Sequence, residues 1–188
     1  MLQMIRSERR LTDYCRHEIS DAGVEVKVDE KLQKDEYIGI KVDDYYAGLR
    51  RKDTPKSVDF IVVVDCACDS YALYILELKG VTSPPGTNEI QEKFATTINR
   101  FMSEEFKDIF LHDRFKYKEI QLYLVTTAYA KAVEMGSFEK YLALRDKLKS
   151  KDSLMYDSSL SDRTYNIKGK SCRIQREVPP NPLIRKIT

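Results

Sequence analysis

Two continuous apolar runs with a short polar connection between them constrain the fold of this chain more than any other feature. The runs are "VDFIVVV" (58–64) and "YALYILELK" (71–79), and the connection is "DCACDS". Unbroken apolar runs of this length are typical of strands that are covered on both faces of a sheet. Each run nevertheless carries charged residues at its outer end, namely Asp59, Glu77 and Lys79. We therefore predict a buried hairpin whose open end brings charged groups together.

The register of this hairpin follows from the position of its turn. Residues 59 and 77 are equally distant from residue 68, which lies in the polar connection. In an antiparallel pair such residues face each other, so Asp59 is expected opposite Glu77. Glu77 and Lys79 are two residues apart and point to the same face of their strand. The three ionisable side chains are thus predicted to converge.

Patterns elsewhere predict helices before and after this hairpin in the chain. Apolar residues at helical spacing indicate an amphipathic helix over 2–22, ended by Gly23. Further helices are expected over 87–111 and 137–150, strands over 24–28, 37–49 and 119–127, a loop over 154–164 and a β-hairpin over 165–178 about Gly169. This order favours an α/β (α+β) fold with a mixed central sheet flanked by helices. We expect one domain over 1–188, with a core over about 2–150 and a C-terminal hairpin and basic tail over about 163–188.

Composition places the chain among ordinary globular proteins, with 42% hydrophobic and 33% charged residues. No apolar run approaches the length of about 18 residues that a membrane span requires, and the N-terminus lacks the apolar core of a signal peptide. A cytoplasmic location and no membrane partner are therefore expected. Among the four cysteines only Cys66 and Cys68 are close in sequence, which predicts reduced thiols rather than a zinc site.

Basic residues cluster in two parts of the chain, although the net charge is only +2. From residue 163 onward there are seven lysines and arginines and one acidic residue, and "RRKDTPK" (50–56) stands just before Asp59. Such clusters suit a polyanionic partner, while a solvated surface is the alternative interpretation. The candidate DNA-contacting residues are Arg50, Arg51, Lys52, Lys56, Lys168, Lys170 and Arg173.

The predicted meeting of Asp59, Glu77 and Lys79 indicates a cation site. Carboxylates are hard oxygen ligands that suit Mg²⁺, which often takes one or two of them together with substrate phosphate oxygens. Two carboxylates and one lysine would leave a negative charge poorly compensated inside a sheet. Lys79 could orient an attacking water, or help to deprotonate it if the pKa of Lys79 were depressed. The alternative is an ordinary cross-strand ion pair at a sheet edge.

The strings "SVD" and "ELK" in this arrangement resemble the PD-(D/E)xK nuclease superfamily, which includes many restriction endonucleases and Holliday-junction resolvases. Its signature is an Asp near the start of one strand and (D/E)-x-K on the next; Val58 stands where the family often has Pro. The family's α-β-β-β-α-β order resembles the order expected over residues 2–127. The resemblance implies hydrolysis of phosphodiester bonds with Mg²⁺, for which Mn²⁺ would substitute. Asp59, Glu77 and the Leu78 carbonyl would hold the metal, and Lys79 would handle the water.

Many members of this superfamily add a glutamate from the first helix. Glu8 and Glu18 are the candidates here, and we favour Glu8 because its "ER-x-L" context is similar to that of resolvase-like members. Gln91, after "ELKG", stands where some members carry a polar active-site residue. Each of these residues could equally be an ordinary surface side chain.

The resemblance favours a metal-dependent DNA endonuclease of the type II restriction kind, in which cutting of both strands would call for a homodimer. A Holliday-junction resolvase or repair nuclease is one alternative. A non-catalytic nucleic-acid-binding relative, or a subunit that needs a partner for cleavage, is another. The chain has no P-loop, G-x-G-x-x-G or H-E-x-x-H string, so no organic cofactor is expected.

Overall fold

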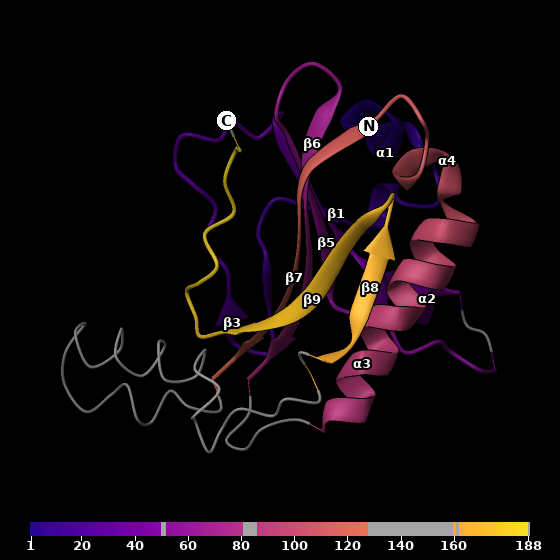
Figure 1. Ribbon diagram of the computed structural model, residues 1–188, viewed down its shortest axis with the longest axis vertical. Helices are drawn as coiled ribbons and strands as arrows, with labels where there is room; N and C mark the ends of the chain where they lie inside the picture. Colours follow the sequence, from indigo (N-terminus) through magenta and orange to yellow (C-terminus); the bar gives the residue numbers. More distant parts are fainter. Residues whose placement is uncertain (50–51, 81–85, 128–159, 161, 188) are drawn as a thin grey trace.

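A seven-stranded mixed sheet forms the centre of the computed structural model, which describes residues 1–49, 52–80, 86–127, 160 and 162–187 (Figure 1). The strands are β1 (Cys15–Arg16), β4 (Tyr37–Lys41), β5 (Phe60–Asp65), β6 (Ser70–Lys79), β7 (Lys116–Thr126), β8 (Thr164–Ile167) and β9 (Lys170–Glu177), with β2 (Ser20–Asp21) and β3 (Val24–Glu25) as a separate pair. Their order in the sheet is β1-β4-β5-β6-β7-β9-β8. The β6–β7 and β7–β9 pairs are parallel, and the others are antiparallel.

Helices cover one face of this sheet. They are α1 (Leu2–Ser7), α2 (Val42–Gly48), α3 (Thr87–Thr96) and α4 (Lys107–Phe110), with a short 3₁₀ helix η1 (Thr12–Tyr14) and a π-helical segment η2 (Thr97–Glu105). Figure 1 shows α3 and α4 along one side of the sheet and the C-terminal segment along the other. The predicted α+β class, the mixed sheet with flanking helices and the hairpin about Gly169 are therefore confirmed.

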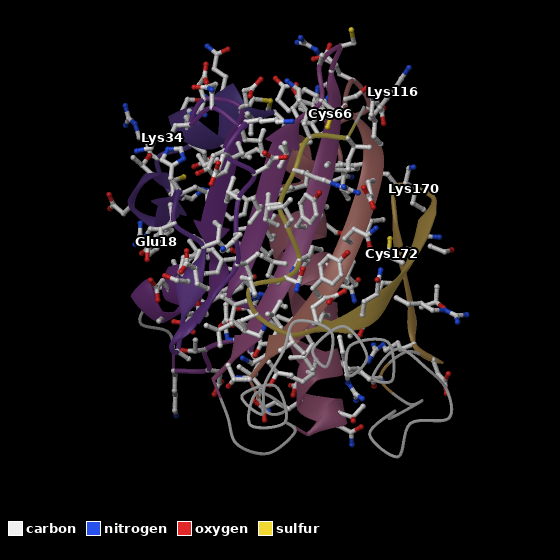
Figure 2. All side chains as sticks on the ribbon, turned by 90° about the vertical axis from the view of Figure 1, so that its left-hand side faces the viewer. Glu18, Lys34, Cys66, Lys116, Lys170 and Cys172 are labelled. Atoms are coloured by element: carbon white, nitrogen blue, oxygen red, sulfur yellow. The ribbon has the colours of Figure 1, made fainter. Side chains whose placement is uncertain are left out.

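Both faces of the central hairpin are buried, as its continuous apolar runs predicted. Ile61 and Ile75 belong to the core beneath the helices, whereas Val62 and Leu76 belong to a second core on the other face. Ile184 packs in that second core, and Figure 2 shows the C-terminal segment crossing this face of the sheet. A strand that is apolar at every position thus has an apolar environment on each side.

The register of the hairpin agrees with the prediction. Phe60 pairs with Leu76 and Asp65 with Tyr71, so each pair is centred on residue 68. The next position outward places Asp59 opposite Glu77, at the point where β5 begins and β6 ends.

The predicted helix over 2–22 is wrong beyond Ser7. Ile5 packs in the core beneath the helices and Ile19 in the core on the opposite face, so one straight helix could not bury both. Instead, Cys15 and Arg16 pair with β4 as strand β1. Sheet pairing and burial on two faces have overridden the helical spacing of the apolar residues.

The predicted strand over 37–49 is also wrong in its second half. It ends at Lys41, and α2 follows at once with Asp43 and Asp44 in its first turn. Acidic side chains there are favourable because they face the positive end of the helix dipole. The strand expected over 24–28 is reduced to β3 and a single bridge from Val28 to Ile184.

The remaining expectations fall into two groups. The helix expected over 87–111 is present as α3, η2 and α4, and the strand expected over 119–127 is β7. The helix expected over 137–150 and most of the loop expected over 154–164 lie outside the described residues. All four cysteines are free thiols. Within the described ranges, no helix is long and apolar enough to cross a membrane.

Candidate functional site

Asp59 and Glu77 meet at the open end of the β5–β6 hairpin, and both are buried. Asp59 is 4% exposed and Glu77 is fully buried. The Leu78 amide donates a hydrogen bond of 2.6 Å to Asp59 Oδ2, so the backbone of Leu78 faces the start of β5. Thr97 holds this start in place, because its hydroxyl accepts from the Val58 amide and donates to a carbonyl of α3.

Glu77 is bound by two lysines through only one of its carboxylate oxygens. Lys79 Nζ lies 2.9 Å and Lys93 Nζ 2.6 Å from Glu77 Oε1. Glu77 Oε2 is buried and accepts no hydrogen bond within the part of the chain that the structure describes. A buried carboxylate oxygen without a partner is costly, and a metal ion is one of the groups that removes this cost.

Asp59 also belongs to a second group of charges. Asp21, Asp43 and Asp59 each offer a carboxylate oxygen, and these oxygens lie within 4.8 Å of one another. Lys41 Nζ lies among them, 3.2 Å from Asp21, 3.1 Å from Asp43 and 4.0 Å from Asp59. Asp59 is therefore shared between this cluster and the pair with Glu77.

Asp21 reaches the site through a close approach of two backbones. It directly precedes Ala22 and Gly23, which have positive φ values and form the turn between β2 and β3. Gly80 follows the last residue of β6, and a Cβ atom there would clash with the Ala22 carbonyl oxygen. The absence of a side chain at Gly80 thus allows the turn that carries Asp21 to lie against the end of β6.

Burial and neighbouring charges shift the pKa values of these groups. Burial and the charge of Glu77 raise the pKa of Asp59 to about 7, against the opposing effects of the Leu78 amide and of Lys41. Burial opposes the charged form of Lys79, but its hydrogen bond to Glu77 and the charge of Glu77 prevail and raise its pKa. Lys79 therefore remains an ammonium group that donates hydrogen bonds. In the metal-free protein this raised pKa favours the first of the two predicted roles of Lys79, orienting the attacking water, over that of proton acceptor.

Neither predicted helix glutamate joins the site. Glu8 forms an ion pair of 3.0 Å with Arg10, which also donates to the carbonyl of Glu105. Glu105 ends η2, about three turns beyond the lysine of α3 that contacts Glu77. Glu18 accepts a hydrogen bond from the Ser20 hydroxyl and is exposed. Glu8 directly follows α1, and its side-chain contacts are with Arg10 rather than with Asp59 or Glu77.

The other predicted residues are scattered. Gln91 lies on α3, two residues before Lys93, a spacing that points the two side chains in different directions. Lys168 donates to carbonyls of the segment before β7, and Lys170 donates to the Lys118 carbonyl. These carbonyls lie near the start of β7, which pairs with the start of β6, at the end of the sheet away from Glu77. Lys52 and Arg173 are exposed, and Arg50 and Arg51 lie outside the described residues.

The prediction missed four charged residues of the site: Asp21, Lys41, Asp43 and Lys93. Lys41 carries the same signal as Glu77, namely a charge at the end of a buried apolar strand. Lys93 stands beside the apolar stripe of α3, which was a weaker signal. Asp21 had no usable signal because its segment was interpreted as helix.

The donors present suit a hard divalent cation such as Mg²⁺. Asp59 and Glu77 would hold the ion, the first through a carboxylate that already faces β6 and the second through the unpartnered Oε2. Lys93 gives Glu77 a second ammonium partner. The uncompensated negative charge of Asp59 and Glu77 is therefore smaller than the sequence indicated. Across the site, four carboxylates face three ammonium groups, which still favours one added cation.

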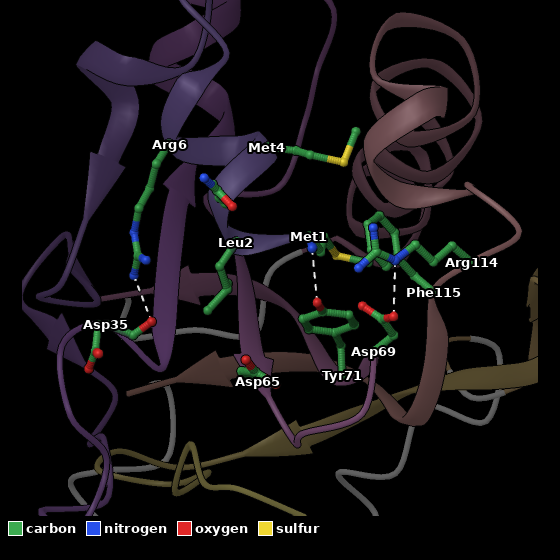
Figure 3. A pocket seen from close by; sticks show the side chains of 11 residues that line it. Met1, Leu2, Met4, Arg6, Asp35, Asp65, Asp69, Tyr71, Arg114 and Phe115 are labelled. Atoms are coloured by element: carbon green, nitrogen blue, oxygen red, sulfur yellow. Dashed lines mark hydrogen bonds and ion pairs between the residues drawn. The ribbon is translucent and has the colours of Figure 1, made fainter.

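A separate charged hollow of about 330 Å³ lies at the opposite end of the sheet (Figure 3). Its lining includes Asp65, Asp69 and Tyr71 around the β5–β6 turn, and Arg114 before β7. Asp69 and Arg114 form an ion pair of 3.0 Å there. Its exposed, paired charges differ from those of the candidate site.

Comparisons with protein-family models, with curated proteins and with solved structures give no significant match for this chain.

Proposed function

We propose that the protein is a Mg²⁺-dependent endonuclease that hydrolyses phosphodiester bonds of DNA, of the restriction type and similar to the PD-(D/E)xK nucleases. One observation carries the proposal. A fully buried glutamate, Glu77, stands one position beyond the Phe60–Leu76 pair and thus opposite Asp59, and its Oε2 accepts no hydrogen bond within the described residues. The spacing of Asp59, Glu77 and Lys79 is also that of the superfamily's signature.

In this proposal Asp59, Glu77 and the Leu78 carbonyl hold the metal. When bound, Mg²⁺ supplies positive charge for the phosphate oxygens and lowers the pKa of a bound water. Lys79 keeps its ammonium group beside Glu77 and donates hydrogen bonds to the attacking water or to the phosphate. Water adds to phosphorus and loses a proton to solvent, the bond from phosphorus to one sugar oxygen breaks, and that oxygen takes up a proton, which leaves a sugar hydroxyl and a phosphomonoester.

Lys93 has a positioning role in this arrangement. Its Nζ contacts the same oxygen of Glu77 as Lys79 does, which leaves the other oxygen available as a ligand. Lys93 is also linked to the start of β5, because its carbonyl accepts from Thr97, which in turn binds the Val58 amide. The helix and the hairpin are thus held in fixed relation at the candidate site.

A hollow along α3, the helix that carries Lys93, has two basic and two acidic side chains in its lining. Its volume is about 500 Å³, and Lys56 and Arg100 are part of its lining. Glu92, which pairs with Lys56 at 3.0 Å, directly precedes Lys93 in α3. Lys56 and Arg100 would offer positive charge to a phosphate backbone in place of their ion pairs with Glu92 and Glu105.

Incubation with long duplex DNA of varied sequence tests the proposal. We expect cleavage with Mg²⁺ or Mn²⁺, none with EDTA, and none by Asp59→Asn or Glu77→Gln. Asp69→Asn, in the hollow at the opposite end, is the matched carboxylate control and should cleave normally. Undiminished metal-dependent cutting by Glu77→Gln would refute the assignment. Branched and single-stranded substrates in the same assay separate a restriction-type enzyme from a junction or repair nuclease.

A further inference from the structure

We infer that Lys41 is a built-in cation of the site, whose ammonium group occupies the place where Asp21, Asp43 and Asp59 would otherwise hold a second divalent ion. The inference deepens the proposed function, since it rests on that proposal for the first ion, between Asp59 and Glu77. It assigns to this chain one exchangeable divalent ion rather than two.

The position of Lys41 Nζ is the first support. It lies 3.1–4.0 Å from the three aspartates, whose nearest oxygens are all within 4.8 Å of one another. Oxygen ligands on opposite sides of a Mg²⁺ or Ca²⁺ ion are about 4–5 Å apart. The carboxylates thus have the spacing of a cation site, and an ammonium group lies within it. A metal ion and Lys41 Nζ could not both occupy this space.

The burial of Lys41 is the second support. Its side chain is 8% exposed, and Nζ lies 4.9 Å from the centre of the Phe60 ring. Lys41 is the last residue of β4 and pairs with Phe60 of β5, so the sheet fixes its backbone directly beside Asp59. Because a buried lysine with three carboxylate neighbours has few other positions, its charge is a permanent part of the site.

The two halves of the site differ in a way that points to one ion. Around Lys41, each aspartate has the ammonium group within ion-pair distance. At Glu77, both lysines bind Oε1, and the buried Oε2 accepts no hydrogen bond within the described ranges. Asp43 Oδ1 also accepts no hydrogen bond there, but it lies 3.1 Å from Lys41 Nζ, whereas both lysine contacts of Glu77 are made at Oε1. The carboxylates around Lys41 thus already have a cation beside them, and the available ligand atom is Glu77 Oε2.

Calorimetric titration with Mn²⁺ tests this inference. Wild-type protein is expected to bind one ion, and Lys41→Met, which keeps the length of the side chain but removes its charge, should bind one more. Lys186→Met is the matched control, because it breaks an exposed ion pair with Glu36 and should leave the stoichiometry unchanged. Two ions in the wild type, or no additional ion in Lys41→Met, would overturn the inference.

Thermal unfolding keeps the test decisive if Lys41→Met is unstable. In EDTA the variant should unfold at a lower temperature than the wild type, and Mn²⁺ should restore most of the difference. Adding Asp43→Asn to Lys41→Met should weaken the additional ion at least tenfold and reduce this rescue. A Lys41→Met protein that stays unfolded at saturating Mn²⁺ would contradict the inference.

The titration also separates this inference from the proposed function. If the wild type binds no Mn²⁺ but Lys41→Met binds one ion, the role of Lys41 stands and the site between Asp59 and Glu77 is refuted. If the wild type binds one ion that Glu77→Gln abolishes, but Lys41→Met gains none, the metal site between Asp59 and Glu77 stands and the inferred role of Lys41 is refuted.

Discussion

The two ends of the β5–β6 hairpin both carry acidic residues beside basic ones, but these charges are exposed at one end and buried at the other. At the turn, Asp69 pairs with Arg114, and their side chains are 41% and 66% exposed. At the open end, Asp59 and Glu77 have side chains that are 6% and 0% exposed. Asp59 shares Lys41 with Asp21 and Asp43, and Glu77 contacts Lys79 and Lys93. Water stabilises the charges at the turn, whereas at the open end only protein groups or a bound ion can do so.

The pKa shifts of the two aspartates show the consequence. The hydrogen bond from Arg114 lowers the pKa of Asp69, so its charged form is the favoured one. Burial and the neighbouring charge of Glu77 raise the pKa of Asp59 to about 7. The comparison teaches that an acidic group next to a basic one is insufficient evidence for a site. A metal site is indicated where a carboxyl group is buried so that its charged form is disfavoured unless a cation binds next to it.

The largest expected contrast is between carboxylates at the two ends. Glu77→Gln should reduce DNA cleavage by at least about a thousandfold, because the amide is a poor ligand and disturbs two lysine contacts. Asp69→Asn should leave the cleavage rate unchanged. The rates are measured at saturating Mg²⁺, with circular dichroism to show that both variants are folded. Equal cleavage rates for the two variants would contradict the claim that the open end of the hairpin is the active site.

A smaller loss is expected for the lysine that donates hydrogen bonds. Lys79→Ala should slow cleavage by about 10²–10³-fold while Mn²⁺ still binds, because the metal ligands remain. Arg114→Ala, which removes a cation at the opposite end, should retain the normal rate. Single-turnover kinetics and calorimetry on the same samples separate the two effects. If Lys79→Ala lost metal binding altogether, Lys79 would be a structural partner of Glu77 rather than a group acting on water or phosphate.

The pH dependence of metal binding should reflect Asp59. Because its pKa is raised to about 7, Mn²⁺ must displace a proton at lower pH, and affinity should fall by up to about tenfold per pH unit below 7. Above that pH the affinity should level off. Titrations in two buffers of different ionisation enthalpy measure the proton released, which should approach one at pH 6 and none at pH 8.5. Affinity that is constant from pH 5.5 to 8.5 would show that Asp59 is not a ligand.

A still smaller effect is expected at the close approach of the β2–β3 turn. Gly80→Ala should destabilise the protein by about 1–3 kcal/mol, because its Cβ would meet the Ala22 carbonyl. Gly86→Ala is the control, since a Cβ there meets nothing within 4 Å and φ is −64°. Urea unfolding gives both values. Equal stabilities of the two variants would mean that the turn carrying Asp21 is not held against β6.

The smallest effect should come from the glutamate that the sequence favoured. Glu8→Gln is expected to keep the cleavage rate within about a factor of two, because Glu8 contacts Arg10 and not the metal-binding pair. A loss comparable to that of Glu77→Gln would restore Glu8 as a site residue.

The sequence predicted the central hairpin well because its information was local. The two apolar runs are separated by one short turn, so the register and the meeting of Asp59 with Glu77 followed from their spacing. The same reasoning found Lys79, which lies on the same strand as Glu77. Each of these inferences depended on a single pair of neighbouring strands.

The residues that were missed reach the site through contacts between distant segments. Asp21 depends on a turn that packs against Gly80, and Lys41 on the pairing of β4 with β5. The spacing of Ile5 and Ile19 was helical by coincidence, since the two side chains enter cores on opposite faces of the sheet. The spacing of apolar residues within one segment cannot show that some of them pack on one face of the sheet and others on the opposite face.

The position of bound Mn²⁺ in a crystal tests the central claim most directly. Crystals soaked in Mn²⁺ would be measured at a wavelength where manganese scatters anomalously. The account predicts one strong peak in contact with Asp59 and Glu77, and none at the position of Lys41 Nζ. A peak at Asp65 and Asp69 at the turn, with none at the open end, would contradict it.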